Sequence, residues 1–365
     1  MVYRSFSAKG GNHAFKILQR SQRYLVPGIV LLLLSSAGLF YLILSGKTRS
    51  TPPIILPPDQ VTTSTVNLVP RRLDGMLVPV GQELLAPRAV MIENEINARP
   101  LSGLSQARVV IEAPVEGGIT RFLAMFDASS TVAEIGPIRS ARPYFVDWAR
   151  AWNSIYFHVG GSPEALSLIQ KLGNGFHQLD EITAGQFFWR SVDRTMPHNT
   201  YINHALMEKA AGETNVASST MPVVWHFQDV TTSTKRGGIV TVKITYGGPY
   251  TVTWKFDPVR DLYTRFQGNK SQNDQDGTAV ESENVIVIKT EAQVLDKIGR
   301  LKLRTIGSGE ALVYRDGNRY AMRWRRGLGE PIKFEGTDGT EILLNRGRTW
   351  IEVTTDDRVF AGLEK

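Results

Sequence analysis

The sequence has no cysteine among its 365 residues. This absence excludes disulfide bonds, a thiol nucleophile, thiolate metal ligands and a lipid-modified cysteine. A chain that works outside the cytoplasm without disulfides must be held together by its hydrophobic core alone. A body of about 300 residues is long enough for such a core, and we expect it to form two domains.

Acidic residues are scarce at the N-terminus: the first is Asp59, whereas seven basic residues lie within the first 50 positions. The remaining 315 residues carry 35 basic and 35 acidic residues, so the formal charge of +7 belongs entirely to the N-terminal segment. A body with no net charge has no basic excess with which to bind nucleic acid. We therefore expect no nucleic-acid partner.

One long uncharged segment is present, the 20 residues Leu25–Leu44. At about 1.5 Å per residue, a helix of this length spans the roughly 30 Å hydrocarbon core of a bilayer. Basic residues precede it, which predicts a cytoplasmic segment over 1–24, a transmembrane signal-anchor over 25–45 and an extracytoplasmic body. A cleaved signal peptide is the less favoured alternative, because its apolar core is usually only about 7–15 residues long. The proline- and threonine-rich residues 46–70 are expected to form an extended linker.

Two different patterns follow the linker. Residues 71–218 mix both kinds of segment, with helices expected at 143–152, 163–172 and 201–211 and strands at 89–92, 108–115, 119–126 and 154–159. Residues 219–365 are dominated by alternating strands, with a polar and mobile loop expected at 270–283. The predicted fold class is therefore α+β: a mixed α/β N-terminal domain and a β-rich C-terminal domain, preceded by one transmembrane helix.

A charged stretch interrupts two apolar strands at 112–121. The glycine pair at 117–118 predicts a two-residue hairpin turn, in which Pro114 faces Arg121. In that register Glu112, Glu116 and Arg121 share one face, with the arginine diagonal to both carboxylates. The triplet either lines a cleft or forms a surface ion pair, and a register shift of one residue would separate it.

Two further segments indicate a site for an anion. Arg139 and Arg142 stand just ahead of an expected helix that begins with proline, from where they can point at an anion. Gly160, Gly161 and Ser162 form a turn between a strand and a helix, where backbone N–H groups can hold phosphate or carboxylate. For the two arginines the alternative is ordinary capping and surface charge, and for Ser162 it is helix capping; in both cases the alternative is the favoured interpretation.

Histidines supply the candidates for acid–base chemistry. His158 and His198 are possible partners of Glu112 or Glu116, as a general acid–base pair. The sequence shows no His-Glu-x-x-His spacing, no Gly-Lys-Ser/Thr phosphate loop and no Gly-x-Ser-x-Gly elbow. We expect no metal and no cofactor.

Five ordered motifs carry a resemblance to a known family: residues 98–107, 116–121, 136–144, 158–162 and 197–199. Together with the tail from Gly307 to Trp350, they resemble the YerB-like family, known as domain of unknown function 3048, and its C-terminal companion domain. The resemblance implies an envelope protein that faces outward from the membrane, and it supplies no activity or catalytic residues. Familiar members are lipoproteins held by a lipidated cysteine, which this chain lacks.

Two hypotheses about function follow. The favoured one is a binding module for an anionic or polyol-rich wall polymer, or for an envelope protein. The alternative is a hydrolase or transferase that acts on such a polymer through Glu112, Glu116, His158 and His198. A structural or chaperone-like role is a third possibility. The expected ligand-binding residues are Arg121, Arg139, Arg142, Gly160, Gly161, Ser162, Arg194, His198 and Asn199.

Overall fold

The computed structural model describes residues 67–213, 220–229, 236–238, 241–355 and 359–362. The predicted membrane anchor and most of the predicted linker lie outside these residues. Among the residues described, no helix is both long enough and apolar enough to span a bilayer. The regular secondary structure of these residues is mostly β-strand. It also includes three α-helices: α2 (Pro143–Ala151), α3 (Pro163–Leu172) and α4 (His204–Glu213).

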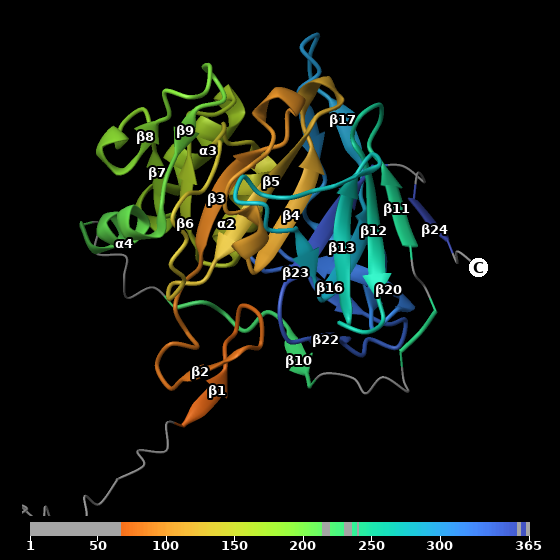
Figure 1. Ribbon diagram of the computed structural model, residues 1–365. Helices are drawn as coiled ribbons and strands as arrows, with labels where there is room; N and C mark the ends of the chain where they lie inside the picture. Colours follow the sequence, from red (N-terminus) through yellow and green to blue (C-terminus); the bar gives the residue numbers. More distant parts are fainter. Residues whose placement is uncertain (1–66, 214–219, 230–235, 239–240, 356–358, 363–365) are drawn as a thin grey trace, which may run out of the picture. The chain divides into compact units, whose positions relative to one another are not determined.

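A ten-stranded mixed sheet is the central element (Figure 1). Its order is β21 (Lys333–Glu335), β20 (Asn318–Arg326), β19 (Gly307–Arg315), β16 (Asn284–Lys289), β23 (Thr349–Thr354), β4 (Val109–Pro114), β5 (Thr120–Phe126), β3 (Arg88–Glu93), β6 (Ile155–His158) and β7 (Gln178–Asp180). Strand β23 pairs in parallel with β4, so both halves of the sequence build this one sheet. The predicted boundary at residue 218 therefore separates two regions with different sequence patterns, and both regions contribute strands to this sheet.

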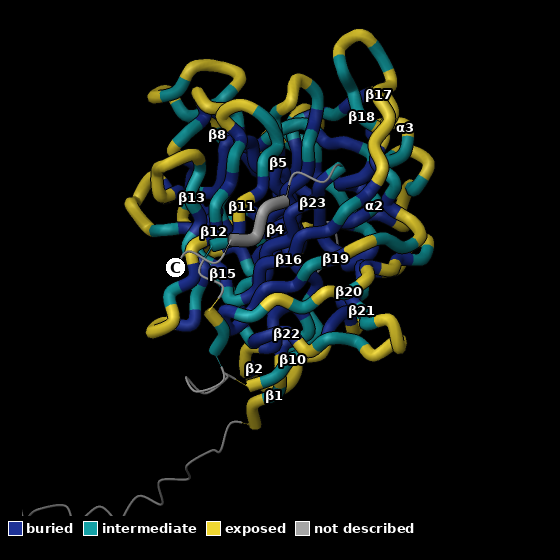
Figure 2. The backbone as a smooth tube through the Cα atoms, turned by 90° about the vertical axis from the view of Figure 1, so that its right-hand side faces the viewer, coloured by how far each residue is buried: buried dark blue, intermediate teal, exposed yellow. Residues whose placement is uncertain are grey.

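The middle strands are buried on both faces, and their sequences explain why. Strands β4 and β16 are largely apolar, as is usual for parallel strands covered on both sides, whereas β23 also buries the polar residues Thr349, Glu352 and Thr354. Figure 2 shows these strands as the dark centre of the molecule. Helices α2 and α3 pack into the core on one face, through residues such as Phe145 and Ala165. The opposite face packs against α4 and a second sheet, through residues such as Met207 and Trp254.

The second sheet comes from the C-terminal half. It has the order β14 (Lys270–Ser271), β13 (Leu262–Gln267), β12 (Thr251–Asp257), β11 (Thr241–Thr245) and β24 (Val359–Gly362), and β15 (Glu281–Ser282) pairs with β13. The prediction of a mobile loop at 270–283 is wrong, because β14 and β15 lie in it. Asp274 in this segment is buried and accepts a hydrogen bond from the Ser105 backbone N–H at 2.8 Å.

The helix predictions are confirmed with one correction. Helices α2 and α3 begin at Pro143 and Pro163, as the proline positions predict. The third helix begins at His204, later than predicted, because Thr200 and Tyr201 form strand β9 and pair with β8 (Trp189–Arg190). Local propensity did not reveal this pairing, which joins residues ten and twelve positions apart.

The predicted hairpin register is wrong by one residue. Pro114 pairs with Thr120 instead of Arg121, because residues Glu116–Gly118 form a 3-10 turn and the Val115 N–H donates to the Ile119 carbonyl. Glu112 is therefore opposite Phe122 and faces the second sheet, whereas Arg121 points to the other face. The shift removes Glu112 from the predicted triplet and leaves Glu116 and Arg121.

The strands give the large sheet two distinct ends. Strands β3, β4, β6, β7, β16 and β23 run in the same direction, so they finish at one end, which we call the carboxyl edge, and start at the other, the amino edge. The hairpin of β1 (Leu68–Pro70) and β2 (Leu77–Pro79) lies near the amino edge, whereas that of β17 (Ala292–Val294) and β18 (Leu301–Leu303) lies at the opposite end in Figures 1 and 2. The described chain thus enters its body at the amino edge.

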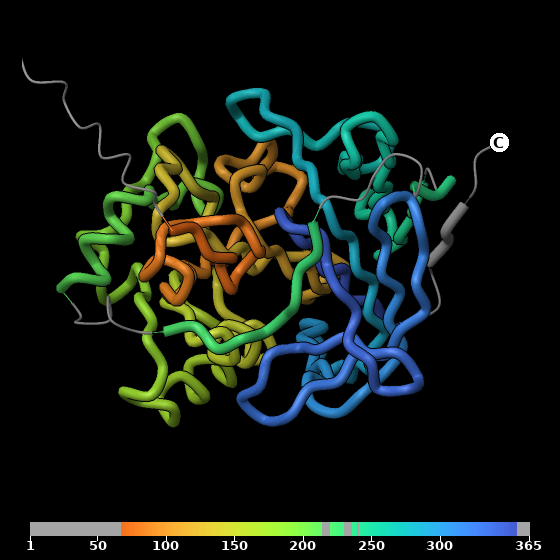
Figure 3. The backbone as a smooth tube through the Cα atoms, turned by 90° about the horizontal axis from the view of Figure 1, so that it is seen from below, coloured from red at the N-terminus to blue at the C-terminus, as the bar shows by residue number. Residues whose placement is uncertain are grey.

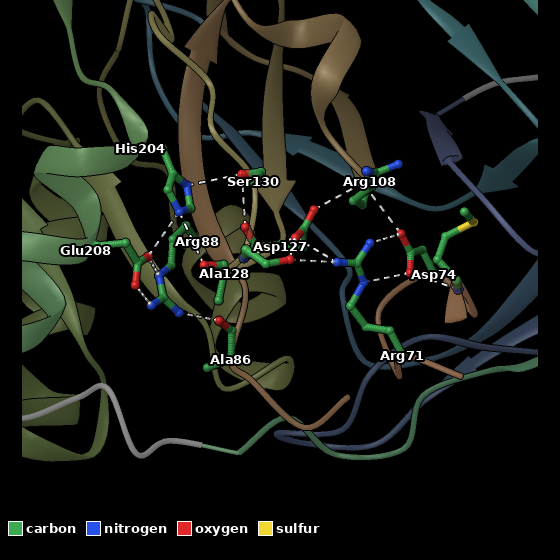
Figure 4. A network of polar contacts seen from close by, with 12 residues as sticks. Arg71, Asp74, Ala86, Arg88, Arg108, Asp127, Ala128, Ser130, His204 and Glu208 are labelled. Carbon is green, nitrogen blue, oxygen red and sulfur yellow. Dashed lines mark hydrogen bonds and ion pairs between the residues drawn. The ribbon is translucent and has the colours of Figure 1, made fainter. Parts of the chain in front are cut away.

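A buried ionic network fixes that entry (Figure 4). Arg71 pairs with Asp74 at 2.7 Å and with Asp127 at 2.6 Å, and Arg108 pairs with Asp127 at 3.1 Å. Residues 220–229 run beside the segment that contains β1 and β2, as Figure 3 shows from below. Met221 donates its backbone N–H to the Leu84 carbonyl. Strand β10 (His226–Gln228) of this segment then pairs with β22 (Leu343–Asn345).

Candidate functional site at the carboxyl edge

Glu93 ends strand β3 at the carboxyl edge and holds two of the predicted site residues. Its carboxylate is buried, forms an ion pair with Arg139 Nε at 2.9 Å and is hydrogen-bonded to His198 Nδ1 at 2.8 Å. In open sheets, ligands bind outside the carboxyl ends of parallel strands, and Glu93 lies at such an end. Glu93 is not among the residues predicted from the sequence, although an acid directly after the apolar run Ala89–Ile92 is a usable signal.

Three arginines gather beside Glu93, and we call Arg121, Arg139 and Arg142 the arginine cluster. Arg142 donates from Nε to Glu116 at 2.9 Å and also contacts that carboxylate through Nη2, and Arg121 lies 3.4 Å from it. Burial works to raise the pKa of Glu116, but the hydrogen bond from Arg142 and the charge of Arg121 lower it below its ordinary value. Glu116 thus orients these two arginines.

The guanidinium of Arg121 has too little negative charge around it to balance the positive charges nearby. Its side chain is only 9% exposed, and its Nη1 donates to the Ser140 carbonyl at 2.9 Å. Burial, followed by the positive charge of Arg142, lowers the pKa of Arg121 to about 10, and Glu116 only partly opposes this. The cluster therefore contains three guanidinium groups and two carboxylates, those of Glu93 and Glu116.

In the glycine turn of residues 160–162, the backbone N–H groups of Gly160 and Ser162 already donate to protein oxygens. The Gly160 N–H donates to Asp180 at 2.7 Å, and the Ser162 N–H donates to the Ala141 carbonyl. The Ser162 hydroxyl accepts the Ala165 N–H and caps α3, which is the role favoured from the sequence. Gly161 forms a bridge with Ala141. We therefore leave this turn out of the proposed site.

A polar pocket of about 650 Å³ lies next to His198. Its walls come from the segments after β3 and β5, from the β8–β9 connection and β9 itself, and from the second half of the chain: Asn97, Glu134, Ser191, Asp193, Arg194, Thr195, His198, Tyr201 and Gln275. Arg194 lines it, but its guanidinium donates to the Ala98 and Pro100 carbonyls at 2.6 Å each, which fixes the loop. Asn199 accepts from Arg190 at 3.2 Å and supports the same loop.

His158 and Glu112 lie inside the protein. The His158 ring is buried, with Nδ1 on the Gly160 carbonyl at 2.7 Å and Nε2 on Gln178 at 2.9 Å. Glu112 is also fully buried; it accepts the Thr120 hydroxyl at 2.6 Å and Arg265 at 2.5 Å. These contacts give both residues structural roles, so the acid–base pairs suggested by the sequence do not assemble around them.

A second glutamate lies beside Glu112 and was missed from the sequence. Glu352 on β23 is the register partner of Glu112 on β4, and Arg265 of the second sheet lies against both. Trp254 and Tyr246 donate to Glu352 at 2.8 and 2.7 Å. Burial, and then the charge of Glu112, raises the pKa of Glu352 to about 8.

Within the described ranges, no three histidine, aspartate or glutamate side chains are grouped to hold a metal ion.

Comparison with known proteins places this architecture in a family. Residues 76–217 match the model described as "Protein of unknown function (DUF3048) N-terminal domain", and residues 241–351 match its C-terminal domain. The chain belongs to the DUF3048 family. A DUF3048 relative, "Putative lipoprotein YerB" of Bacillus subtilis, is 32% identical over 279 residues, which cover 74% of this chain and 81% of YerB. The resemblance identified from the sequence motifs is thereby confirmed.

A solved structure supports the fold of this DUF3048 chain. The crystal structure of YerB from Bacillus subtilis matches it with a TM-score of 0.72 and 30% identity, over 80% of this chain and 98% of that one. The descriptions of the DUF3048 domains state no activity, so any function has to be argued from the site itself.

Proposed function

We propose that this protein is a membrane-tethered, extracytoplasmic binding module whose arginine cluster holds an anionic group of a cell-wall polymer. The observation that carries the proposal is Arg121, a nearly buried guanidinium whose pKa is lowered to about 10 by burial and by neighbouring positive charge. A ligand carboxylate or phosphate supplies the missing negative charge.

The geometry of the cluster suits such a ligand. Guanidinium groups bind carboxylate and phosphate with two parallel hydrogen bonds, which gives orientation as well as attraction. Glu116 holds Arg142, and Glu93 holds Arg139, whose side chain is 23% exposed. Side chains fixed in this way lose little conformational entropy when a ligand binds.

The location rests on two supports. The uncharged run Leu25–Leu44, preceded by basic residues, predicts a membrane anchor with the body outside. The relative YerB carries the name of a lipoprotein, which is a membrane-attached class of protein. A reporter enzyme fused to Lys365 should therefore be active only in the extracytoplasmic compartment, and activity confined to the cytoplasm would contradict this location.

The binding test uses isolated cell walls of Bacillus subtilis and the full chain in detergent. We expect wall retention of the chain to fall about tenfold or more in Arg139→Gln and in Arg142→Gln, because each loses a charge-assisted contact worth about 1.5–3 kcal/mol. Raising the salt concentration should weaken retention of the wild-type chain as well.

The matched control is Arg108→Gln, which removes a partly exposed, ion-paired arginine at the amino edge. It should leave retention unchanged. Equal loss in the control and in the cluster variants, or no loss in either, would refute the arginine cluster as the binding site. Retention by an acidic envelope protein but not by walls would redirect the proposal to a protein partner.

A further inference from the structure

Three histidines of the body differ in how their ring nitrogens are used. His158 has partners for both nitrogens, and His204 likewise contacts Ser130 at 3.1 Å and the Ala128 carbonyl at 3.2 Å. His198 uses only Nδ1, on Glu93 at 2.8 Å. Within the described part of the chain, no residue lies within hydrogen-bonding distance of His198 Nε2, and the Glu95 carboxylate is 3.8 Å from it. The first two arrangements are structural, and the third leaves one nitrogen for a ligand.

Glu93 determines which nitrogen of His198 is basic. A carboxylate only accepts hydrogen bonds, so the neutral ring carries its proton on Nδ1 and its lone pair on Nε2. Arg139 fixes the other carboxylate oxygen of Glu93 at 2.9 Å, and the Glu93 backbone N–H donates to Pro137. A buried carboxylate that orients a histidine is the arrangement by which enzymes prepare a general base.

The ring of His198 is partly exposed and lines the 650 Å³ pocket. Amide and hydroxyl groups of Asn97, Thr195 and Gln275 share that lining, which suits a substrate rich in hydroxyl groups. Gln275 accepts from Arg194 through Oε1 at 3.1 Å, so its amide NH₂ is the donor left for an oxyanion.

We propose that His198 is the general base of an esterase site, acting on carboxylic esters of a polyol-rich polymer. Water attacks the ester carbonyl carbon while His198 Nε2 takes one of its protons, and the tetrahedral oxyanion accepts a hydrogen bond from Gln275. The C–O bond to the alcohol then breaks, and the imidazolium returns the proton to the departing alkoxide. The products are a carboxylic acid and an alcohol. This activity is distinct from the proposed function, because it needs His198 and the pocket, whereas wall binding needs the arginine cluster; the two share the Glu93–Arg139 pair.

The test measures hydrolysis of p-nitrophenyl acetate and of an O-acetylated polysaccharide by the full chain in detergent. We expect His198→Ala to lower kcat/KM by about 100-fold or more, the usual contribution of a general base. Added imidazole should restore part of the rate to His198→Ala, because it fills the vacated space and supplies the base. A purely structural histidine would give no such rescue.

Two further variants make the outcome decisive. Glu93→Gln should lower kcat by about tenfold or more while changing KM little, because it disturbs the tautomer and not the pocket. His204→Gln, at the amino edge, should hydrolyse both probes as the wild type does. Absence of hydrolysis by the wild-type chain, or equal rates in His198→Ala and wild type, would overturn the proposal. If His198→Ala does not fold, loss of the oxyanion donor in Gln275→Ala must lower kcat, and an unchanged kcat would also overturn it.

Discussion

The amino and carboxyl edges of the large sheet use the same residue types for different purposes. At the amino edge, Arg71 and Arg108 face Asp74 and Asp127, so charges of opposite sign are equal in number. Burial acts against ionised Arg71, but the hydrogen bond and charge of Asp74, with those of Asp127, raise its pKa. At the carboxyl edge the balance fails, and the pKa of Arg121 falls to about 10.

An arginine beside a carboxylate is therefore not by itself evidence of a ligand-binding site. What distinguishes the two edges is that nearby carboxylates outweigh the effect of burial on the pKa of Arg71 and do not outweigh it for Arg121. A third arrangement lies between the two sheets, where the two carboxylates of Glu112 and Glu352 share one arginine, Arg265. There the deficit is of positive charge, and burial together with the charge of Glu112 raises the pKa of Glu352 to about 8.

The largest expected effect is at the amino edge. Arg71→Gln leaves Asp74 buried without its main partner, and removing one member of a buried pair costs about 3–5 kcal/mol. The free energy of unfolding, measured by urea denaturation of the full chain, should fall by that amount. A loss below about 1 kcal/mol would mean that the network does not hold the entry of the chain.

Glu116→Gln should have the next largest effect, a loss of about 2 kcal/mol, because Arg142 and Arg121 lose a charged acceptor. Inorganic phosphate should restore part of this stability, since the variant cluster has a larger excess of positive charge. The control is Glu208→Gln, which breaks a pair with Arg88 near the amino edge and should gain nothing from phosphate. Equal gains in both variants would argue against an anion site.

Glu352→Gln tests the buried carboxylate pair through pH. The folded pKa of Glu352, about 8, lies above its unfolded value, so the folded state binds more protons between about pH 4.5 and 8. Wild-type stability should therefore decline as pH rises through that range, by at most about 1.4 kcal/mol per unit from this group. The slope should be shallower in Glu352→Gln, and an unchanged slope would place the titration elsewhere.

The smallest effect is expected for Arg121→Gln, which mirrors Arg71→Gln at similar burial. Because Arg121 lies among like charges, its loss should cost about 1 kcal/mol or less in the absence of ligand. Urea denaturation of the two variants side by side measures the contrast. Equal losses would show that the two edges are energetically alike.

Local sequence signals predicted much of the fold. Proline at the first helical position predicted the starts of α2 and α3, and apolar runs predicted β3, β4, β5 and β6 to within about two residues. The contact between Glu116 and Arg121 was expected, because the two residues lie on the same hairpin. The register failed since a 3-10 turn replaced the expected two-residue turn, and a change of one residue exchanges the faces of a strand.

The uncharged N-terminal run, the neutral body, the family motifs and the main helices could be read from the chain alone, because they depend on composition and on near neighbours. Which charges meet depends on the folded structure. It brought His198 to Glu93 across 105 positions and Arg265 to Glu112 across 153, through strand order and loop packing. Charge balance depends on such distant encounters, so the difference between a structural ion network and a candidate site becomes visible only in the folded chain.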